Sequence, residues 1–320
     1  MRAIVLDRPG SFRVAQVPDP APGAEQVVVK VEACGICGTD IHIMDGEFPP
    51  TPYPITPGHE FAGTIAAIGA DVNATLGLSV GDKIAVDPSL LCGYCKRCRA
   101  GRDNLCENWA AIGDTTDGAF AEYVAVPAVN VHRLPEHIDG QQGAMIEPLA
   151  CSVHGLRRLG SVFGDSVVLA GAGTMGLLLL QLLVHAGAGP VTVLDRVEGR
   201  LEVARKLGAS RTATDLAELK DERFEIGVDA TGVAPVIQGV SELLDRGGRF
   251  LVFGVSPAEA TLAASPFKIY NDEITITGSM AILRSFAPAV ELLSSGAVDV
   301  RPLLSTPLPL ESFGDALTRV

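Results

Sequence analysis

The chain has 320 residues, a formal net charge of −13 and a hydrophobic content of 47%. Its length predicts two domains, and its apolar content is sufficient for a substantial core in each. The acidic balance, without any long basic stripe, argues against nucleic acid as a partner.

The first 150 residues predict a β-rich domain. Short runs of β-branched and apolar residues recur there between turns rich in proline and glycine. The N-terminus lacks the charged head, long apolar run and cleavage site of a secretory signal. We expect strands at Ala3–Leu6, Gln26–Ala33, Phe61–Ile68, Lys83–Val86 and Ala121–Pro127.

From Asp165 onward, predicted strands and helices alternate. This spacing predicts an α/β fold in which a doubly wound parallel sheet carries helices on both faces. We expect helices from Thr174, over Glu198–Leu207, up to about Leu244 and over Phe286–Ser295. The expected strands are Ser166–Ala170, Val191–Asp195, Phe224–Ala230, Arg249–Val255 and Glu273–Gly278.

The segment from Val167 to Val184 has eighteen residues without a charge, which by length alone is a candidate membrane span. Its internal glycines instead predict a short buried strand followed by a leucine-rich helix. We therefore expect no membrane partner. The seven cysteines are clustered rather than spread as a disulfide framework, which favours the cytoplasm.

Four cysteines in one short segment have the spacing C-x2-C-x2-C-x7-C; they are Cys92, Cys95, Cys98 and Cys106. Four thiolates this close in sequence can enclose one tetrahedral zinc ion. The main alternative is a ferredoxin-type iron–sulfur run, which has three residues before its last cysteine and a proline after it. Here seven residues precede Cys106 and Glu107 follows it, so the pattern predicts structural zinc.

A G-x-G-x-x-G sequence follows one predicted strand and opens the next helix. Its first glycine permits a tight turn, its second lets the backbone approach a pyrophosphate, and its third packs the helix against the strand. The alternative is a turn that serves packing alone. The candidate cofactor-binding residues are Gly171, Gly173, Thr174, Met175, Gly176, Asp195, Arg196, Arg200 and Thr231.

Asp195 ends the next strand and is placed to accept hydrogen bonds from both ribose hydroxyls of a dinucleotide. Its charge would repel a 2′-phosphate, which favours NAD over NADP. Arg196 beside it would instead neutralise such a phosphate, so the preference stays open.

A second set of metal-ligand types comprises Cys37, His59, Glu60 and Glu147. Thiolate, imidazole and carboxylate are all good zinc ligands, but sequence spacing does not show that these four meet. Each has a plainer interpretation: a buried thiol, a strand end for His59-Glu60, and a helix start for Glu147.

Together these elements resemble the zinc-dependent medium-chain dehydrogenase/reductase superfamily, and within it the polyol (sorbitol-type) dehydrogenases. The resemblance extends over almost the whole chain. It rests on G-I-C-G-T-D-I-H, G-H-E, the four-cysteine segment, D-G-A-F-A-E-Y, I-E-P-L-A and the glycine motif. It implies a β-rich GroES-like catalytic domain over 1–150 with 285–320, and a Rossmann NAD-binding domain over 151–284.

The resemblance also implies roles for single residues. Cys37, His59 and Glu60 would bind a catalytic zinc, and Glu147 would bind it directly or through a water molecule. Asp40 would hydrogen-bond His59 and fix its tautomer. Thr39 would contact the reacting oxygen, and His42 would pass a proton to solvent, although without the resemblance His42 is an ordinary surface histidine.

The leading hypothesis is a dehydrogenase with two zinc ions per chain that oxidises a secondary hydroxyl of a polyol or sugar alcohol with NAD. One alternative is the same reaction on a simple alcohol, an amino alcohol or threonine. Others are a zinc-independent quinone or enone reductase and a non-enzymatic nucleotide-sensing zinc protein. Neither of these needs Cys37, His59 and the glutamates together. The resemblance further implies a homodimer or homotetramer.

Overall fold

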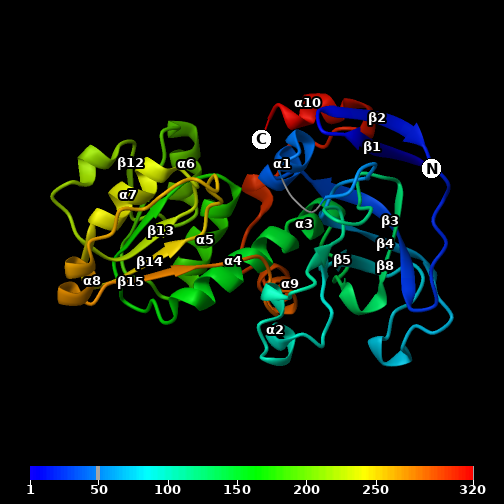
Figure 1. Ribbon diagram of the computed structural model, residues 1–320, viewed down its shortest axis with the longest axis horizontal. Coiled ribbons are helices and arrows are strands. Elements are labelled where there is room, and N and C mark those ends of the chain that lie inside the picture. The colour runs from blue at the N-terminus through cyan, green and yellow to red at the C-terminus, as the bar shows by residue number, and fades with distance from the viewer. Residues whose placement is uncertain (48–50, 320) are drawn as a thin grey trace. The chain divides into compact units, whose positions relative to one another are not determined.

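The computed structural model describes residues 1–47 and 51–319 (Figure 1). The chain divides into two compact units. The first contains Met1–Glu147, Ala289–Ser294 and the chain from Leu304 on, and the second contains Pro148–Pro288 and Ser295–Leu303. The boundary at Glu147 lies within one continuous helix, α4 (Ile146–Leu159).

The first unit is built on a five-stranded antiparallel sheet with the order β8-β3-β4-β5-β9. Its buried face carries Val27, Val29, Phe61, Ile65 and Ile84, which form one apolar cluster with neighbouring residues. Alternation of apolar and polar residues along β3 turns one face of the strand to this core. The strands are β3 (Gln26–Gly35), β4 (Glu60–Ile68), β5 (Lys83–Val86), β8 (Tyr123–Pro127) and β9 (Val131–Arg133).

Smaller elements surround this sheet. A hairpin of β1 (Arg2–Arg8) and β2 (Ser11–Gln16) forms a separate two-stranded sheet, as do the two short strands β6 (Ser89–Leu90) and β7 (Ala110–Ala111). The helices of the unit include α1 (Gly38–Asp45), α2 (Lys96–Arg99), α3 (Gly140–Ala144) and α10 (Phe313–Leu317).

The second unit contains a six-stranded sheet with the order β12-β11-β10-β13-β14-β15, in which every neighbouring pair is parallel. In chain order this is the 3-2-1-4-5-6 arrangement of a dinucleotide-binding fold, with its reversal between β10 and β13. The strands are β10 (Val167–Ala170), β11 (Val191–Leu194), β12 (Arg211–Ala213), β13 (Phe224–Asp229), β14 (Leu244–Val252) and β15 (Thr275–Gly278).

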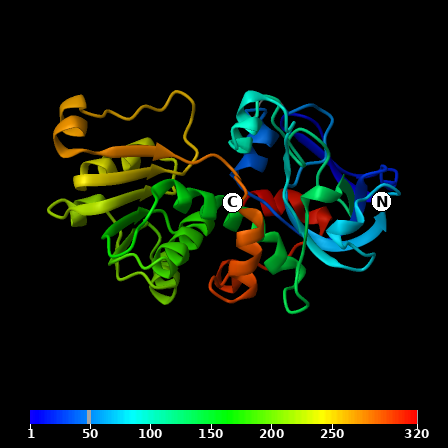
Figure 2. The same cartoon turned by 90° about the horizontal axis from the view of Figure 1, so that it is seen from below.

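Helices cover both faces of this sheet. Val167 and Leu169 of β10 share an apolar cluster with residues of α5 (Thr174–His185) and α6 (Glu198–Lys206). Val168 and Ala170 of the same strand join the opposite cluster with α7 (Ala234–Glu242). β15 and the preceding helix α8 (Pro266–Asp272) lie at the outer edge of the sheet, drawn in orange in Figure 2. The expected α/β class and the doubly wound sheet are confirmed.

Several expected elements differ in detail. β14 begins at Leu244 rather than at Arg249, because a bulged stretch lets Leu244 pair with Phe224 before the regular register starts at Arg249. The preceding helix therefore ends at Glu242. The edge strand β12 was not expected, because Arg211–Ala213 is short and polar.

The uncharged run from Val167 is divided as its glycines predict, into strand β10 and helix α5. Within residues 1–47 and 51–319, no helix combines the length and apolar character needed to cross a membrane.

Candidate active site and metal centres

Cys37 lies immediately before helix α1 and caps it. The backbone N–H of Thr39 donates to Cys37 Sγ at 3.3 Å, while Asp40 Oδ2 accepts from the Cys37 backbone N–H at 3.0 Å. This reciprocal pair is a capping box, with cysteine in the place usually taken by serine or threonine. The helix N-terminus therefore presents a sulfur ligand and favours its thiolate form, although burial raises the pKa of Cys37.

The structure brings His59 to this sulfur. His59 Nε2 lies 3.1 Å from Cys37 Sγ, and the imidazole is buried. Sulfur and nitrogen ligands of one tetrahedral zinc are about 3.5 Å apart. The pair needs to separate by only a few tenths of an ångström to share an ion, so the two donors suit the metal.

Glu60 and Glu147 complete a second group around the same histidine. One ligand atom from each of His59, Glu60 and Glu147 lies within 4.8 Å of the others, and all three side chains are buried. The four expected ligands thus form two overlapping groups that share His59. Burial and the neighbouring Glu147 raise the pKa of Glu60 to about 8. Two buried carboxylates this close are both ionised only when a cation lies between them; otherwise one of them holds a proton. The pair therefore also suits a metal ion.

Gly35 makes room for this arrangement. Gly35 pairs with Glu60 across strands β3 and β4, and a Cβ at position 35 would overlap the Glu60 carboxylate. A side chain at position 35 would therefore force the Glu60 carboxylate to move from its place beside His59.

The partner of the second His59 nitrogen differs from the expectation. Asp40 Oδ1 lies 3.7 Å from His59 Nδ1, beyond hydrogen-bond distance, whereas Asp114 Oδ1 lies at 3.2 Å. Asp114 was not among the predicted site residues. It has no local sequence signal, since only the folded chain brings it to His59. Burial raises the pKa of Asp40 to about 6.

Thr39 and His42 both lie on α1 and are three residues apart, so they share one side of the helix. Thr39 is half-buried, and the His42 side chain is 45% exposed with its Nδ1 at 3.1 Å from Glu47 Oε2. Thr39 and His42 are thus both partly exposed on one side of α1, where a proton relay to solvent would need them.

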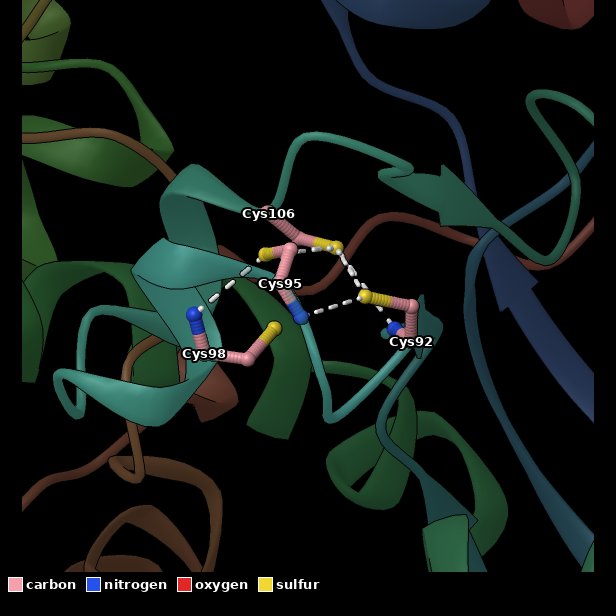
Figure 3. A group of neighbouring side chains, drawn as sticks. All are labelled: Cys92, Cys95, Cys98 and Cys106. Carbon is pink, nitrogen blue, oxygen red and sulfur yellow. Dashed lines mark hydrogen bonds between the residues drawn. The ribbon is translucent and has the colours of Figure 1, made fainter.

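The four clustered cysteines converge as their spacing predicts (Figure 3). All four sulfurs lie within 4.8 Å of one another, with 3.5 Å between Cys106 and Cys92 and 4.0 Å between Cys95 and Cys106. A tetrahedron of sulfurs around zinc has edges of about 3.8 Å. The backbone N–H groups of Cys95 and Cys98 donate to Cys92 Sγ and Cys95 Sγ, both at 3.4 Å.

These donors favour thiolates in the cysteine cluster. Burial would raise the pKa of Cys92, but N–H donors led by that of Cys95 outweigh it and lower the pKa to about 6. Burial and the Cys95 thiol raise the pKa of Cys98 to about 12. Four thiolates therefore coexist here only around a cation, and the sulfur-only donor set suits zinc.

The three motif glycines have three different environments. Gly171 has a φ of +99°, which favours glycine, and a Cβ at Gly176 would overlap the Gly171 carbonyl oxygen. A Cβ at Gly173 would meet nothing within 4 Å. Gly173 is also the N-cap of α5 and makes no side-chain cap. The helix therefore begins with uncapped N–H groups beside open space, the arrangement that suits a pyrophosphate.

Asp195 lies beside this loop. Its Oδ2 accepts from the Ala172 backbone N–H and its Oδ1 from that of Val197, both at 2.8 Å. Arg200 Nη1 lies 3.9 Å from Asp195 Oδ2, and Arg196 is exposed. Thr231 follows β13 on the other side of the sheet reversal, and its hydroxyl donates to the buried Asp229 at 2.6 Å.

Comparison with known proteins shows which family the chain belongs to. Residues 23–136 match the family described as the alcohol dehydrogenase GroES-like domain, and residues 174–295 match the zinc-binding dehydrogenases. D-arabinitol dehydrogenase 1 of Uromyces fabae is 35% identical to this chain, and the aligned region covers 100% of this chain and 94% of that protein. D-altritol 5-dehydrogenase of Agrobacterium fabrum is also 35% identical, with coverages of 98% and 94%.

Two further matches bear on substrate and cofactor. An L-threonine 3-dehydrogenase of Paraburkholderia xenovorans is 31% identical, with coverages of 99% and 94%. The crystal structure of a zinc-binding dehydrogenase of Sinorhizobium meliloti bound to NADP has a TM-score of 0.94 and 35% identity, covering 99% of this chain and 95% of that one.

The chain belongs to the zinc-dependent medium-chain dehydrogenases, in their polyol dehydrogenase branch. It is an oxidoreductase, and zinc and a nicotinamide dinucleotide are its cofactors. The GroES-like and Rossmann assignments of the two parts are confirmed.

Proposed function

We propose that this enzyme oxidises a secondary hydroxyl of a polyol or sugar alcohol to a ketone and transfers the hydride to NAD. The proposal depends mainly on Glu147, which is buried beside His59 and Glu60. The resemblance associates a glutamate at this position with the polyol enzymes and a cysteine with the alcohol dehydrogenases. The named relatives that act on D-arabinitol and D-altritol support the same substrate class.

In this proposal Cys37, His59, Glu60 and Glu147 hold the catalytic ion. Zinc, when bound, supplies a Lewis acid that lowers the pKa of an alcohol hydroxyl and stabilises the alkoxide. Thr39 would accept the hydroxyl proton while it passes its own hydroxyl proton onward, and His42, which reaches solvent, would exchange a proton with water. The glycine loop and Asp195 hold the dinucleotide that receives the hydride.

The test is a substrate panel of pentitols, hexitols, vicinal diols and L-threonine, followed by the absorbance of the reduced nicotinamide. The highest kcat/KM for a pentitol or hexitol supports the proposal. The highest value for L-threonine would favour the second candidate, threonine oxidation, to which the 31% identical relative points. One zinc ion per chain, without turnover of any alcohol, would favour a sensing protein.

Cofactor preference gives the first prediction. Asp195→Ala should raise the ratio of kcat/KM for NADP to that for NAD by at least about tenfold, or 1.4 kcal/mol, because it removes a carboxylate that would face a 2′-phosphate. Arg196 and Arg200 stay in place to attract that phosphate. Steady-state kinetics with both cofactors measure the ratio.

Asp195→Asn separates charge from hydrogen bonding in this experiment. Asp195 also accepts from the loop N–H of Ala172, so Asp195→Ala weakens the loop for both cofactors. The asparagine keeps one acceptor oxygen but no charge, and it should shift the ratio in the same direction. A ratio that stays constant in both variants would mean that Asp195 does not distinguish the cofactors.

We also propose that the enzyme is a homo-oligomer that pairs through edge strand β15, and that it works in the cytoplasm, where reduced thiols persist. The edge side of β15 is unpaired within the described chain. Exposed apolar side chains occur on β15 and on the preceding helix α8, namely Ile276 at 39% on the strand and Phe267 at 71% and Tyr270 at 82% on the helix. An unpaired edge beside apolar surface is suited to pairing with another copy.

Ile276→Lys should therefore convert the oligomer to a species of one-chain mass, 33.3 kDa, or at least weaken it measurably. Light scattering coupled to size exclusion gives the mass. Val129→Lys, which places the same charge on an exposed valine of the other unit, is the matched control and should keep the wild-type mass. An Ile276→Lys protein with the wild-type mass at every concentration would exclude this edge.

A further inference from the structure

One ring nitrogen of His59, Nδ1, faces two carboxylates. Its Nε2 is turned to Cys37 Sγ, so Nδ1 is the nitrogen left for a supporting contact. Asp114 Oδ1 lies 3.2 Å from Nδ1 and Asp40 Oδ1 lies 3.7 Å from it. All three side chains are buried, and none of these three atoms has a well-directed hydrogen bond to another described residue. Three buried polar atoms that face only one another need a shared proton, and the imidazole N–H supplies it.

We propose that Asp114 is the positioning residue of His59: its carboxylate accepts the Nδ1–H, fixes the tautomer and orients Nε2 toward the metal. The inference rests on the proposed catalytic zinc site. A histidine that ligates a metal through one nitrogen is held in place by the acceptor on its other nitrogen, which also raises its basicity.

Asp40 is committed elsewhere. Its Oδ2 accepts from the Cys37 backbone N–H at 3.0 Å and so caps helix α1. Asp114 Oδ1 is the nearer of the two oxygens that face His59 Nδ1, at 3.2 Å against 3.7 Å for Asp40 Oδ1, and neither oxygen has another hydrogen-bond partner among the described residues. We therefore assign the cap of Cys37 to Asp40 and the support of His59 to Asp114.

The backbone around Asp114 explains how it reaches His59. Residues 112–118 follow strand β7 and form a loop that we call the Asp114 loop, which is tied to the segment that leads into His59. Gly118 N–H donates to Thr56 O at 2.7 Å, and Ala119 N–H donates to Gly58 O at 2.8 Å. A Cβ at Gly113 or Gly118 would overlap the Gly58 carbonyl. Backbone-to-backbone contact therefore sets the distance between the two side chains.

The experiment measures release of zinc from the purified holoenzyme to a chromogenic chelator at fixed pH. Wild-type protein should release two zinc ions per chain in two phases, of which the cysteine cluster supplies one and serves as the internal reference. Asp114→Asn and Asp114→Ala should speed the other phase, by about 10- to 100-fold for the alanine, since loss of such a support typically costs this much metal affinity. The asparagine should have the smaller effect, because it keeps a neutral acceptor.

Asp117→Asn is the matched control in the same loop. Asp117 is exposed and its Oδ1 accepts from the Thr56 backbone N–H at 2.9 Å, so it anchors the loop without facing His59. It should release zinc at the wild-type rate. The proposal is wrong if both Asp114 variants match wild type, or if Asp117→Asn accelerates release equally, since the effect would then come from a loosened loop. A wild-type chain with only the cysteine-bound zinc would instead refute the catalytic site itself.

Discussion

Replacing His59 with alanine, or Cys37 with serine, should reduce turnover by about a thousand-fold or more while leaving dinucleotide binding largely intact. Each change removes one member of the buried pair whose donor atoms are 3.1 Å apart. The catalytic ion contributes several kcal/mol to stabilising charge in the transition state, and each 1.4 kcal/mol lost slows the reaction about tenfold. The glycine loop and Asp195 belong to the other unit, so neither substitution removes a residue that we expect to hold the dinucleotide.

The measurement combines kcat, zinc content and titration with reduced dinucleotide. Cys34→Ser is the matched control for Cys37→Ser, because Cys34 lies three residues earlier and is not a member of any of the three ligand groups. It should keep two zinc ions and turnover close to that of wild type. Unchanged kcat in His59→Ala would remove the catalytic metal assignment, whereas loss of dinucleotide binding would point to a wider folding defect.

Sequence reasoning succeeds here where the signal is local. The three motif glycines lie within six residues, and Gly171 and Gly176 have the tight turn and the close packing predicted for them, because one turn between a strand and a helix imposes both demands. The approach of a pyrophosphate to Gly173 stays a prediction. The cysteine cluster is likewise a local structure, closed by donors only three residues away.

Asp114 shows where such reasoning ends. Its contact with His59 depends on a loop whose glycines pack on Gly58 across two segments distant in sequence. An aspartate in a turn is ordinary, so nothing near it in the sequence marks its role. Helix α1 was also missed, although Cys37 and Asp40 form a capping box, because cysteine is not among the usual N-cap residues. Both misses concern the metal site, where function rather than local preference sets the residue type.

Cys98→Ser should release the structural zinc and unfold the cysteine lobe, residues 91–108, while the sheet cores remain. The lobe has almost no apolar core of its own: its cluster consists of the buried Cys95, Cys98 and Cys106, against which Cys92 and Trp109 pack. The ion therefore takes the place of a hydrophobic core, as in small zinc domains, where metal binding contributes about 10–16 kcal/mol to the free energy of folding. Serine is a poor substitute for a thiolate ligand of zinc.

Trp109 makes this loss visible, because it is the single tryptophan of the chain and packs against the cysteine cluster. Its emission should shift to longer wavelength in Cys98→Ser, zinc content should fall from two ions to one, and proteolysis should begin within the lobe. Cys151 is a partly buried cysteine outside all three ligand groups, so Cys151→Ser should keep two ions and wild-type emission. A Cys98→Ser protein with two ions and an unshifted spectrum would contradict the structural role. The apolar cluster of the antiparallel sheet shares no residue with the cysteine cluster of the lobe. Cys98→Ser should therefore unfold the lobe locally before it lowers the stability of the rest of the unit.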